Sequence, residues 1–338
     1  MQSFYALTPD ELVAELKLEK KFQGKQLYNH LVKGETEFEA MTDLPKALRE
    51  RLITEYKSPL SSQVVQVQDS DSAKKLAIRL KDHKVVECVL LTDGEGRKTA
   101  CLSSQVGCAM GCRFCKTGTM GLYRNLEAAE IVEQFIHLLK IAPELTHIVF
   151  MGMGEPLANF GQVVKAITFI HDPKGLNISL RRITISTCGL VPGIQKLAEI
   201  NLPIRLAVSL VSADNETRSK LMKVNEAFPL QDLKASLLNF QHINDKRITL
   251  EYCMLSGVNT TEQAAKELSY FVKGLDAVVN LIPWNAIDEL DFDTPTESEI
   301  YNFTRCLDRL GIHYTRRVSK GRDISGACGQ LAAKQPLS

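Results

Sequence analysis

The chain has 338 residues, 44% of them hydrophobic and 24% charged, which is enough to bury a large core in two or three domains or in one barrel with an extension. A net charge of +1 and a pI near 7.6 give no overall sign of a polyanionic partner, so a site for nucleic acid would have to be local. The nine cysteines are an odd set unlike a secreted disulfide framework, and no run reaches the roughly 18 apolar residues of a membrane span, which argues against a membrane protein.

The first part of the chain predicts a small helical domain. Acidic residues interrupt the start, MQSFYALTPDELVAELKLEKK, so we expect no signal peptide and a cytoplasmic protein. Residues 8–56 alternate polar and apolar positions at helical spacing, and Thr8 with Glu11 forms a capping-box pattern. We place a helical accessory domain at residues 1–58.

Short β-like runs begin near residue 60. They read SQVVQVQ, KLAIRL and KVVECVLLT, and the turn DGEG ends the last of them. Such runs bounded by turn residues predict a small antiparallel element. We place this β extension, or linker, at residues 59–96, where it leads into the main domain.

Residues 97–338 alternate strands with amphipathic helices, which implies parallel crossovers. The six strand candidates are TACLSS, THIVFMGM, RRITIST, PIRLAVSL, RITLEYCML and AVVNLIPW. Periodicity alone leaves a partial barrel and a doubly wound sheet open. Polar and glycine-rich stretches follow the strands directly, as in GMGEP, STCG, SLVSAD and PWN, and active sites of parallel barrels form at that rim. We therefore expect an α/β fold with a partial (β/α)6 barrel.

Three cysteines, Cys108, Cys112 and Cys115, gather in the stretch CAMGCRFC without a fourth cysteine nearby. Zinc usually takes four ligands, commonly as two separated pairs, so a zinc site would need a remote cysteine or histidine. Iron–sulfur clusters also use cysteine thiolates, normally four per cluster. Three ligands would leave one iron of a four-iron cluster open to bind a substrate. The cysteines expected to be core thiols are Cys88, Cys188, Cys253 and Cys306.

The spacing C-x3-C-x2-C, with Phe114 before the last cysteine, resembles the signature of the radical S-adenosylmethionine (SAM) superfamily. The stretch GMGEP at 152–156 resembles that superfamily's site for the methionine amino group. Together with CLSSQVGCAMGCRFC, FMGMGEPLAN, RRITISTCG, LIPWN and ACGQLA, these motifs resemble the RlmN/Cfr family of RNA adenine methyltransferases. The resemblance runs from about residue 85 to residue 332, and more weakly through the helical N-terminal region.

The resemblance implies the cofactors and their ligands. Cys108, Cys112 and Cys115 would hold a 4Fe-4S cluster, and two molecules of SAM would be used in each turnover. The expected contacts to SAM are Gly154, Glu155, Ser186, Ser209 and Asn285. Taken singly, the two serines and the asparagine would be ordinary residues at strand ends.

The resemblance also implies three catalytic residues. Cys328, in GACGQL, would receive a methyl group from one SAM, and a radical made from the second SAM would convert that group to a methylene radical that adds to adenine. Cys101 would then attack the Cys328 sulfur, which forms a transient disulfide and releases the product. Glu87 would remove the adenine proton as a general base. From the residues alone, Cys101 could be a small buried hydrophobe, Cys328 part of a packed tail, and Glu87 a strand residue that faces solvent or pairs with a lysine.

Three features depart from the family pattern. Val211 stands where the family usually has histidine after Ser-Leu. The stretch CKTGTMG resembles the Cfr side of the family, whereas LIPWN and GEPLAN resemble the RlmN side, so carbon 2 and carbon 8 of adenine both stay open as targets. The loop AIDELDFDTPTESE at 286–299 is acidic and would repel phosphates if it faced RNA.

The implied partner is RNA: a 23S rRNA adenine in first place, with tRNA as a second candidate. Two basic clusters could hold phosphates, Arg181 with Arg182 and a C-terminal set of Arg316, Arg317, Lys320 and Arg322. The helical N-terminal domain would read RNA shape, an electron donor such as flavodoxin would serve the cluster, and the enzyme would be a monomer. The alternatives are a Cfr-like carbon-8 methyltransferase, a related enzyme that acts on a different RNA, and a zinc-stabilised RNA-binding protein.

Overall fold

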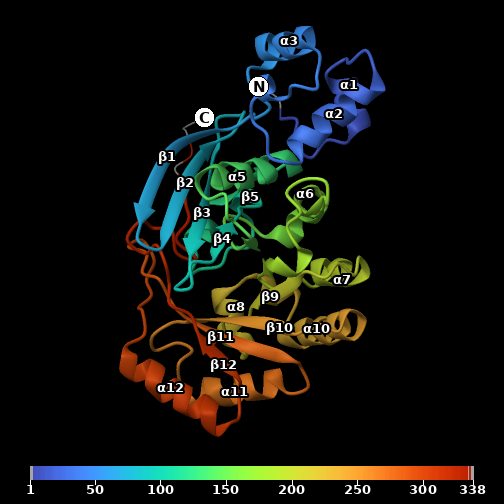
Figure 1. The fold of residues 1–338 in the computed structure, drawn as a ribbon. Coiled ribbons are helices and arrows are strands. Elements are labelled where there is room, and N and C mark those ends of the chain that lie inside the picture. Colours follow the sequence, from blue (N-terminus) through green and yellow to red (C-terminus); the bar gives the residue numbers. More distant parts are fainter. Residues whose placement is uncertain (1–2, 334, 336–338) are drawn as a thin grey trace.

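The structure of the protein is a computed structural model that describes residues 3–333 and 335. Helices form the N-terminal region, as the periodicity predicts: α1 (Pro9–Glu15), α2 (Lys21–Leu31), η1 (Phe38–Ala40) and α3 (Lys46–Tyr56) (Figure 1). The predicted capping box is confirmed, because the Glu11 N–H donates to Thr8 Oγ1 at 3.2 Å and the Thr8 N–H donates to the Glu11 carboxylate at 2.6 Å.

The predicted antiparallel element is also present. It consists of β1 (Gln63–Ser70), β2 (Ala73–Arg79) and β3 (Val85–Thr92). The turn DGEG connects β3 to β4 (Lys98–Cys101), and the Asp93 carboxylate closes this turn by accepting the N–H groups of Glu95 and Arg97. Since β3 pairs with β4, the extension continues directly into the main sheet.

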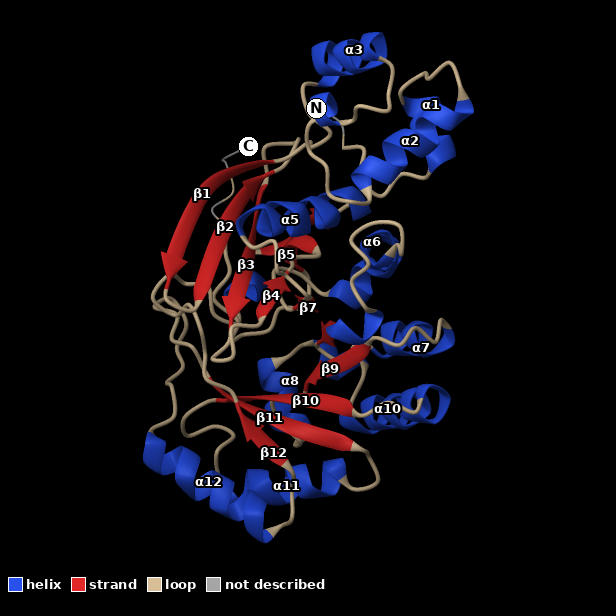
Figure 2. Ribbon diagram, in the orientation of Figure 1, coloured by secondary structure: helices blue, strands red, loops and turns tan. Residues whose placement is uncertain are grey.

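The main sheet is parallel from β4 onward. Its further strands are β7 (His147–Phe150), β8 (Ile183–Thr187), β9 (Arg205–Ser209), β10 (Ile248–Met254), β11 (Ala277–Pro283) and β12 (Tyr314–Arg316). Neighbouring strands follow one another in chain order without the reversal that defines a doubly wound sheet. The sheet is open between β1 and β12, so the architecture is the expected partial barrel (Figure 2).

Helices stack along one side of this curved sheet (Figure 1). The main ones are α5 (Ala128–Ile141), α6 (Phe160–His171), α7 (Val191–Glu199), α10 (Leu230–Asn244), α11 (Glu262–Val272) and α12 (Glu297–Arg309). The chain also forms short helices that do not all belong to this stack: α4 (Lys116–Thr119), η2 (Pro156–Asn159), η3 (Leu180–Arg182), α8 (Asn215–Leu221) and α9 (Val224–Ala227). Within the described residues no helix combines the length and apolarity that a membrane crossing needs.

Two elements were not predicted. A two-stranded ribbon, β5 (Gln105–Cys108) with β6 (Gly121–Asn125), lies where the sequence indicated a polar loop. The glycines permit it, because a Cβ at Gly107 would lie 1.9 Å from the Gly121 carbonyl oxygen. The seventh parallel strand, β12, is only three residues long, which is too short for an apolar pattern that would reveal a strand.

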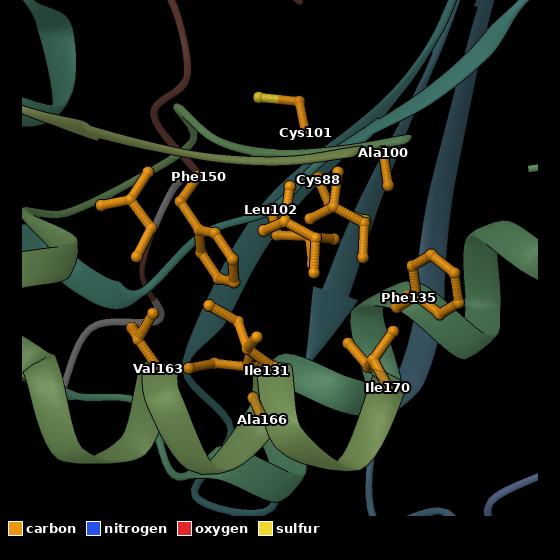
Figure 3. Packing of buried hydrophobic residues seen from close by; sticks show 14 of the residues in the cluster. Cys88, Ala100, Cys101, Leu102, Ile131, Phe135, Phe150, Val163, Ala166 and Ile170 are labelled. Atoms are coloured by element: carbon orange, nitrogen blue, oxygen red, sulfur yellow. The ribbon is translucent and has the colours of Figure 1, made fainter. Parts of the chain in front are cut away.

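The core between sheet and helices decides which way Cys101 faces. In Figure 3, Ala100 and Leu102 point toward the helices that carry Ile131, Phe135 and Ala166, and Cys101 points the opposite way. Alternation along an extended chain produces this split. The Cys101 thiol is thereby directed to the inner side of the barrel.

The N-terminal helices pack on α6. The Tyr5 and Tyr28 rings meet Phe169 edge-on, at centroid distances of 6.2 and 5.9 Å. The Tyr28 hydroxyl donates to the Asp172 carboxylate at 2.6 Å. Buried residues of this region and of the barrel form one continuous apolar cluster. The helical region is therefore built onto the barrel.

Candidate active site

A cavity of about 170 Å³ opens at the carboxyl ends of the parallel strands. The predicted site residues that line it are Cys108, Cys112, Cys115, Gly154, Glu155, Ser186, Ser209, Asn285 and Cys328. A second, smaller cavity adjoins it and is lined by Cys101, Met151, Arg317, Lys320 and again Cys328. The structure thus brings every predicted site residue except Glu87 to one of these two cavities.

The three clustered cysteines share one wall of the first cavity. Cys108 ends β5, Cys112 lies in the following bend, and Cys115 precedes α4. Burial raises the pKa of all three thiols, that of Cys108 to about 12, and the charges of Cys115 and Cys108 raise the pKa of Cys112 further. Thiolates crowded in such surroundings need a cationic centre, which cluster iron supplies. The donor set fits a cluster with one open iron.

The zinc alternative finds less support in the same side chains. No group of three histidine, cysteine, aspartate or glutamate side chains in the described part of the chain is arranged to hold a single metal ion. A structural zinc ion is usually surrounded by four close ligands. The described side chains offer no such compact set.

The stretch GMGEP is fixed against the chain that leads into the cysteines. The N–H groups of Ser104 and Gln105 both donate to the Met153 carbonyl, and the Glu155 N–H donates to the Gln105 side-chain oxygen at 2.8 Å. Gly154 has a φ of 101°, and a Cβ there would lie 2.5 Å from the Gln105 Cβ. Only glycine satisfies both conditions.

Glu155 is a buried carboxylate aimed by the backbone. Its oxygens accept the N–H groups of Cys188 at 2.8 Å and Leu157 at 3.0 Å. Burial raises the pKa of Glu155, and the hydrogen bond from the Cys188 backbone opposes that rise most strongly. A cationic group entering the cavity would find an acceptor there already oriented.

Arg218 joins the ends of β8 and β9 from behind the cavity. Its guanidinium donates to the carbonyl oxygens of Cys188 at 2.7 Å and Leu210 at 3.0 Å, and to the Asn225 side chain at 2.8 Å. The residue is fully buried, and burial lowers its pKa to about 10. Nothing in the polar helical run NETRSK revealed this role. These bonds hold the two strand ends that carry Ser186 and Ser209.

Val211, where the family usually has histidine, forms part of the cavity wall. Its side chain is buried beside Cys188 and Trp284, and its carbonyl accepts the Asn259 side-chain N–H at 2.7 Å. Its φ is 61°, a left-handed conformation that costs a non-glycine residue about 1–2 kcal/mol. The departure replaces a polar ring by an apolar surface.

Cys328 lies on a C-terminal segment, residues 322–333, that is docked at several points. The Cys328 carbonyl accepts the Asn285 side-chain N–H at 3.0 Å, and the Gly329 carbonyl accepts the Lys116 N–H at 2.7 Å. The other end of the Asn285 amide accepts from Arg322 at 2.8 Å. Asn285, expected to contact SAM, therefore holds the Cys328 segment in this structure.

Cys101 faces Cys328 across the second cavity. Burial raises the pKa of the Cys101 thiol to about 12, the charge of Cys328 adds to the rise, and the charge of Arg317 opposes it. All nine cysteines lie in the described ranges and all are free thiols. The disulfide between Cys101 and Cys328, which is expected only transiently during turnover, is thus not formed in this structure.

Glu87 lies outside both cavities. It is buried on β3, where one oxygen lies 3.0 Å from Lys75 Nζ and the other accepts the Ala332 N–H at 2.8 Å. Lys75 also donates to the Ser325 carbonyl at 3.3 Å. The Glu87–Lys75 ion pair thus holds the Cys328 segment at Ser325 and at Ala332. In this structure Glu87 is a strand residue paired with a lysine, and its carboxylate is not free to act as a base.

Two of the cysteines expected in the core belong to the site. Cys188 and Cys253 line the first cavity, so their placement as core thiols was incomplete. Cys188 follows β8 directly, a position that the motif STCG already indicated, and Cys253 is the next-to-last residue of β10. Cys88 is fully buried, as expected of a core thiol, whereas Cys306 on α12 is only half-buried and packs against the edge of the core.

The acidic loop covers the cysteine segment. Glu289 forms an ion pair with Lys116 at 2.5 Å, and Phe292 packs against Trp284, whose indole N–H donates to the Phe114 carbonyl at 2.9 Å. Asp288, Asp291, Asp293 and Glu297 of the loop are exposed, whereas Glu299 is half-buried and accepts the Ser256 hydroxyl at 2.8 Å. The basic residues near the C-terminus have different surroundings. Arg316 pairs with Glu297. Arg317 and Lys320 line the second cavity, and Arg322 donates to the Asn285 side chain.

Known proteins resemble this chain over nearly its full length. A sequence model of the radical SAM superfamily matches residues 102–268. A relative from Treponema pallidum, "Probable dual-specificity RNA methyltransferase RlmN", is 44% identical over 325 residues, which cover 96% of each chain. A relative of the same name from Treponema denticola is also 44% identical, over 96% of this chain and 94% of its own.

A solved structure agrees with these relatives. The crystal structure of a radical SAM methyltransferase from Sphaerobacter thermophilus superimposes with a TM-score of 0.92, at 38% identity, over 99% of this chain and 100% of that one. Similarity of that extent covers the cysteine segment, the GMGEP stretch and the C-terminal segment alike. The chain therefore belongs to the RlmN/Cfr family of radical SAM RNA adenine methyltransferases.

Proposed function

We propose that the enzyme methylates carbon 2 of an adenine in 23S rRNA, and of an adenine in tRNA, through a methyl group carried on Cys328. The observation that supports this most is the position of Cys328, which lines both cavities. One sulfur can thus face the cofactor in the first cavity and Cys101 in the second. The relatives' name, a dual-specificity RNA methyltransferase, supports two classes of RNA substrate.

The first cavity would bind the cofactors, and the second would hold the two sulfurs that release the product. When bound, the 4Fe-4S cluster and two molecules of SAM supply a methyl group and a carbon radical. Cys108, Cys112 and Cys115 would hold the cluster, and Glu155 would accept the ammonium group of SAM. The other SAM contacts are proposed at Gly154, Ser186, Ser209 and, once it releases the C-terminal segment, Asn285.

Release of the product falls to the second cavity. Once the adenine adduct has lost one electron and its ring proton, the Cys101 thiolate would attack Cys328 Sγ. An S–S bond then forms while the Cys328 sulfur–carbon bond breaks, and its electron pair passes to the carbon, which takes up a proton to become the product methyl group. Glu87 can serve as the general base only after the Ala332 N–H and Lys75 give up its carboxylate. The docked C-terminal segment therefore has to open before that proton is removed.

The remaining proposals concern partners. Residues 1–58 would recognise RNA shape, residues 59–96 would connect them to the barrel, and residues 97–338 would carry the chemistry. Ala109 and Arg113 of the cysteine segment are exposed, which supports access for an electron donor such as flavodoxin. We also propose that the enzyme acts as a monomer in the cytoplasm.

The direct test supplies cluster-loaded protein with SAM bearing a fully deuterated methyl group, a reductant, and unmodified ribosomal RNA or tRNA. Mass spectrometry of the digested RNA should show methyladenosine that has lost one donor deuterium, and comparison with standards should assign carbon 2. Assignment to carbon 8 would support the Cfr-like alternative. An intact deuterated methyl group would refute the methylene route.

Two cysteine variants test whether Cys328 carries the methyl group. Cys328→Ala should abolish methyl transfer to RNA, because no sulfur is left to hold the methyl group. Cys306→Ala, which removes a half-buried thiol on α12, should retain activity within about twofold. Continued transfer by the Cys328 variant would contradict the proposal.

A further inference from the structure

We propose that Arg317 is a positioning residue whose guanidinium holds the Cys328 thiolate where the two cavities meet. The inference rests on the proposed carrier role of Cys328. Sequence reasoning placed Arg317 with the basic residues that could contact phosphates. The structure places its side chain at both cavities instead.

The strand that precedes Arg317 sets its direction. Its N–H donates to the Leu281 carbonyl at 2.9 Å, which extends the β12–β11 pairing by one residue and fixes Arg317 at the carboxyl end of the sheet. Because side chains alternate along a strand, Arg316 faces outward and forms a two-fold hydrogen bond with Glu297. Two adjacent arginines thus have opposite surroundings.

The inward guanidinium donates from Nη1 to the neutral Met151 sulfur at 3.8 Å, and it shares the two cavities with Cys101, Glu251 and Cys328, which carry or acquire negative charge. The charge of Cys328 is the largest influence that raises the pKa of Arg317, ahead of Glu251 and Cys101, while burial opposes the rise. Arginine stays protonated in proteins and presents five donors in a fixed fork, so it offers a permanent positive charge to these groups.

Both proposed sulfur steps need such a charge. Cys328 must be a thiolate to accept a methyl group, and Cys101 must be one to attack Cys328, since the thiolate is the nucleophilic form. Burial works against ionisation of Cys101. Arg317 lines the second cavity with both sulfurs, so one cation can stabilise the thiolate in each step.

Glu251 supplies the opposing charge. It is buried on β10, lines the first cavity with Arg317, and accepts the Asn280 side-chain N–H at 2.8 Å. The charge of Arg317 works against the rise that burial causes in the Glu251 pKa. Glu251 therefore competes with the sulfurs for the guanidinium. The titratable or charged groups around Cys328 and Arg317 are Cys101, Cys115, Glu251, Cys253 and Lys320.

The test measures thiol reactivity and requires neither RNA nor turnover. The protein is treated with iodoacetamide over a series of pH values, and peptide mass spectrometry follows the alkylation of Cys328. Arg317→Gln should slow this reaction about tenfold at neutral pH and move its pH profile upward, because loss of the nearby cation disfavours the thiolate. Arg317→Lys should restore part of the rate, since it keeps the charge without the fork.

Two further variants separate charge from structure. Glu251→Gln should accelerate alkylation of Cys328 and move the profile downward, because the competing anion is gone. Arg316→Gln, the outward neighbour, should leave the profile unchanged. Circular dichroism of each variant checks that the fold is intact.

An unchanged profile in both Arg317→Gln and Glu251→Gln, or an equal shift in Arg316→Gln, would overturn the inference. Should Arg317→Gln fail to fold, the other two variants give the test: Arg317→Lys should alkylate Cys328 more slowly than the wild type and Glu251→Gln faster, and the opposite changes would overturn the inference. Failure of the proposed function gives a different result. Wild-type protein incubated with SAM would then carry no methyl group on Cys328, whether or not the alkylation profile responds to the variants.

Discussion

Glu155 depends on the glycine before it. Gly154 adopts a φ of 101° with its Cα pressed against Gln105, and the Gln105 side chain in turn accepts the Glu155 N–H. The buried carboxylate is thus aimed by backbone that has no room for a Cβ. At this scale the site is built by close approach of two loops, and a single methyl group is enough to disturb it.

Gly154→Ala should lower the free energy of unfolding by about 2 kcal/mol or more, because it combines a left-handed backbone with a 2.5 Å contact to the Gln105 Cβ. It should also weaken SAM binding about tenfold by displacing Glu155. Urea unfolding and isothermal titration calorimetry measure the two effects. Gly161→Ala is the control: a Cβ there meets nothing within 4 Å, and alanine should stabilise α6 by up to about 1 kcal/mol.

Residues whose role depends on local spacing could be predicted from sequence. The three clustered cysteines and Glu155 lie in short motifs, and the structure places them all at the first cavity. Arg218 could not be found, because the carbonyls of Cys188 and Leu210 that it binds follow two different strands, which only the fold brings together. The inward direction of Arg317 likewise depends on β12, a strand that the sequence does not reveal.

Among the elements, the connection between α3 and β1 is fixed by one face of α5. Glu133 accepts the N–H groups of Ser61 and Ser62 at 2.7 and 2.9 Å, and the Ser62 hydroxyl lies 3.0 Å from His137 Nε2. Burial lowers the pKa of His137 to about 4, and the charge of Lys140 lowers it too. The helix therefore holds the connection through a histidine that must stay neutral.

This histidine predicts an acid-sensitive fold. Its pKa is depressed from about 6.5 to about 4, so its contribution to stability is complete above pH 6.5 and is lost as the pH falls through 4. The loss should approach about 3 kcal/mol in the free energy of unfolding. Urea unfolding at a series of pH values measures it, and His137→Gln should flatten the profile in this window. The exposed His242→Gln should not; equal flattening would contradict the assignment.

The main strands and helices were predictable because each is an apolar run of sufficient length between turn residues. The six strand candidates became β4, β7, β8, β9, β10 and β11. The β5–β6 ribbon escaped prediction because Gly107 and Gly121 make that stretch resemble a loop, although both glycines serve strand pairing there. The order of the strands also came from sequence, since the polar rim favoured a barrel.

On the scale of the whole molecule, the helical N-terminal region and the barrel share one apolar core. Phe4, Leu27 and Phe38 are buried in the same cluster as barrel residues such as Ile148. Separating the two parts would expose those side chains to water at a cost of about 25 cal/mol for each Å². The two regions are therefore expected to unfold together.

Calorimetry should show one unfolding transition with equal calorimetric and van't Hoff enthalpies. Tyr28→Phe, which removes the hydrogen bond to Asp172 between the two regions, should lower the free energy of unfolding by about 1 kcal/mol without splitting that transition. Helix signal lost at a lower temperature than the sheet signal would show instead that the N-terminal region unfolds by itself.

Asn285 has a consequence for the order of events. Its side chain binds the Cys328 carbonyl with one end and Arg322 with the other, so a ligand that takes this amide must first displace the C-terminal segment. By thermodynamic reciprocity, the docked segment lowers the affinity for such a ligand by the same factor by which the bound ligand lowers the docking of the segment. Cofactor binding at Asn285 would thus loosen the C-terminal segment, and loosening of that segment would favour cofactor binding.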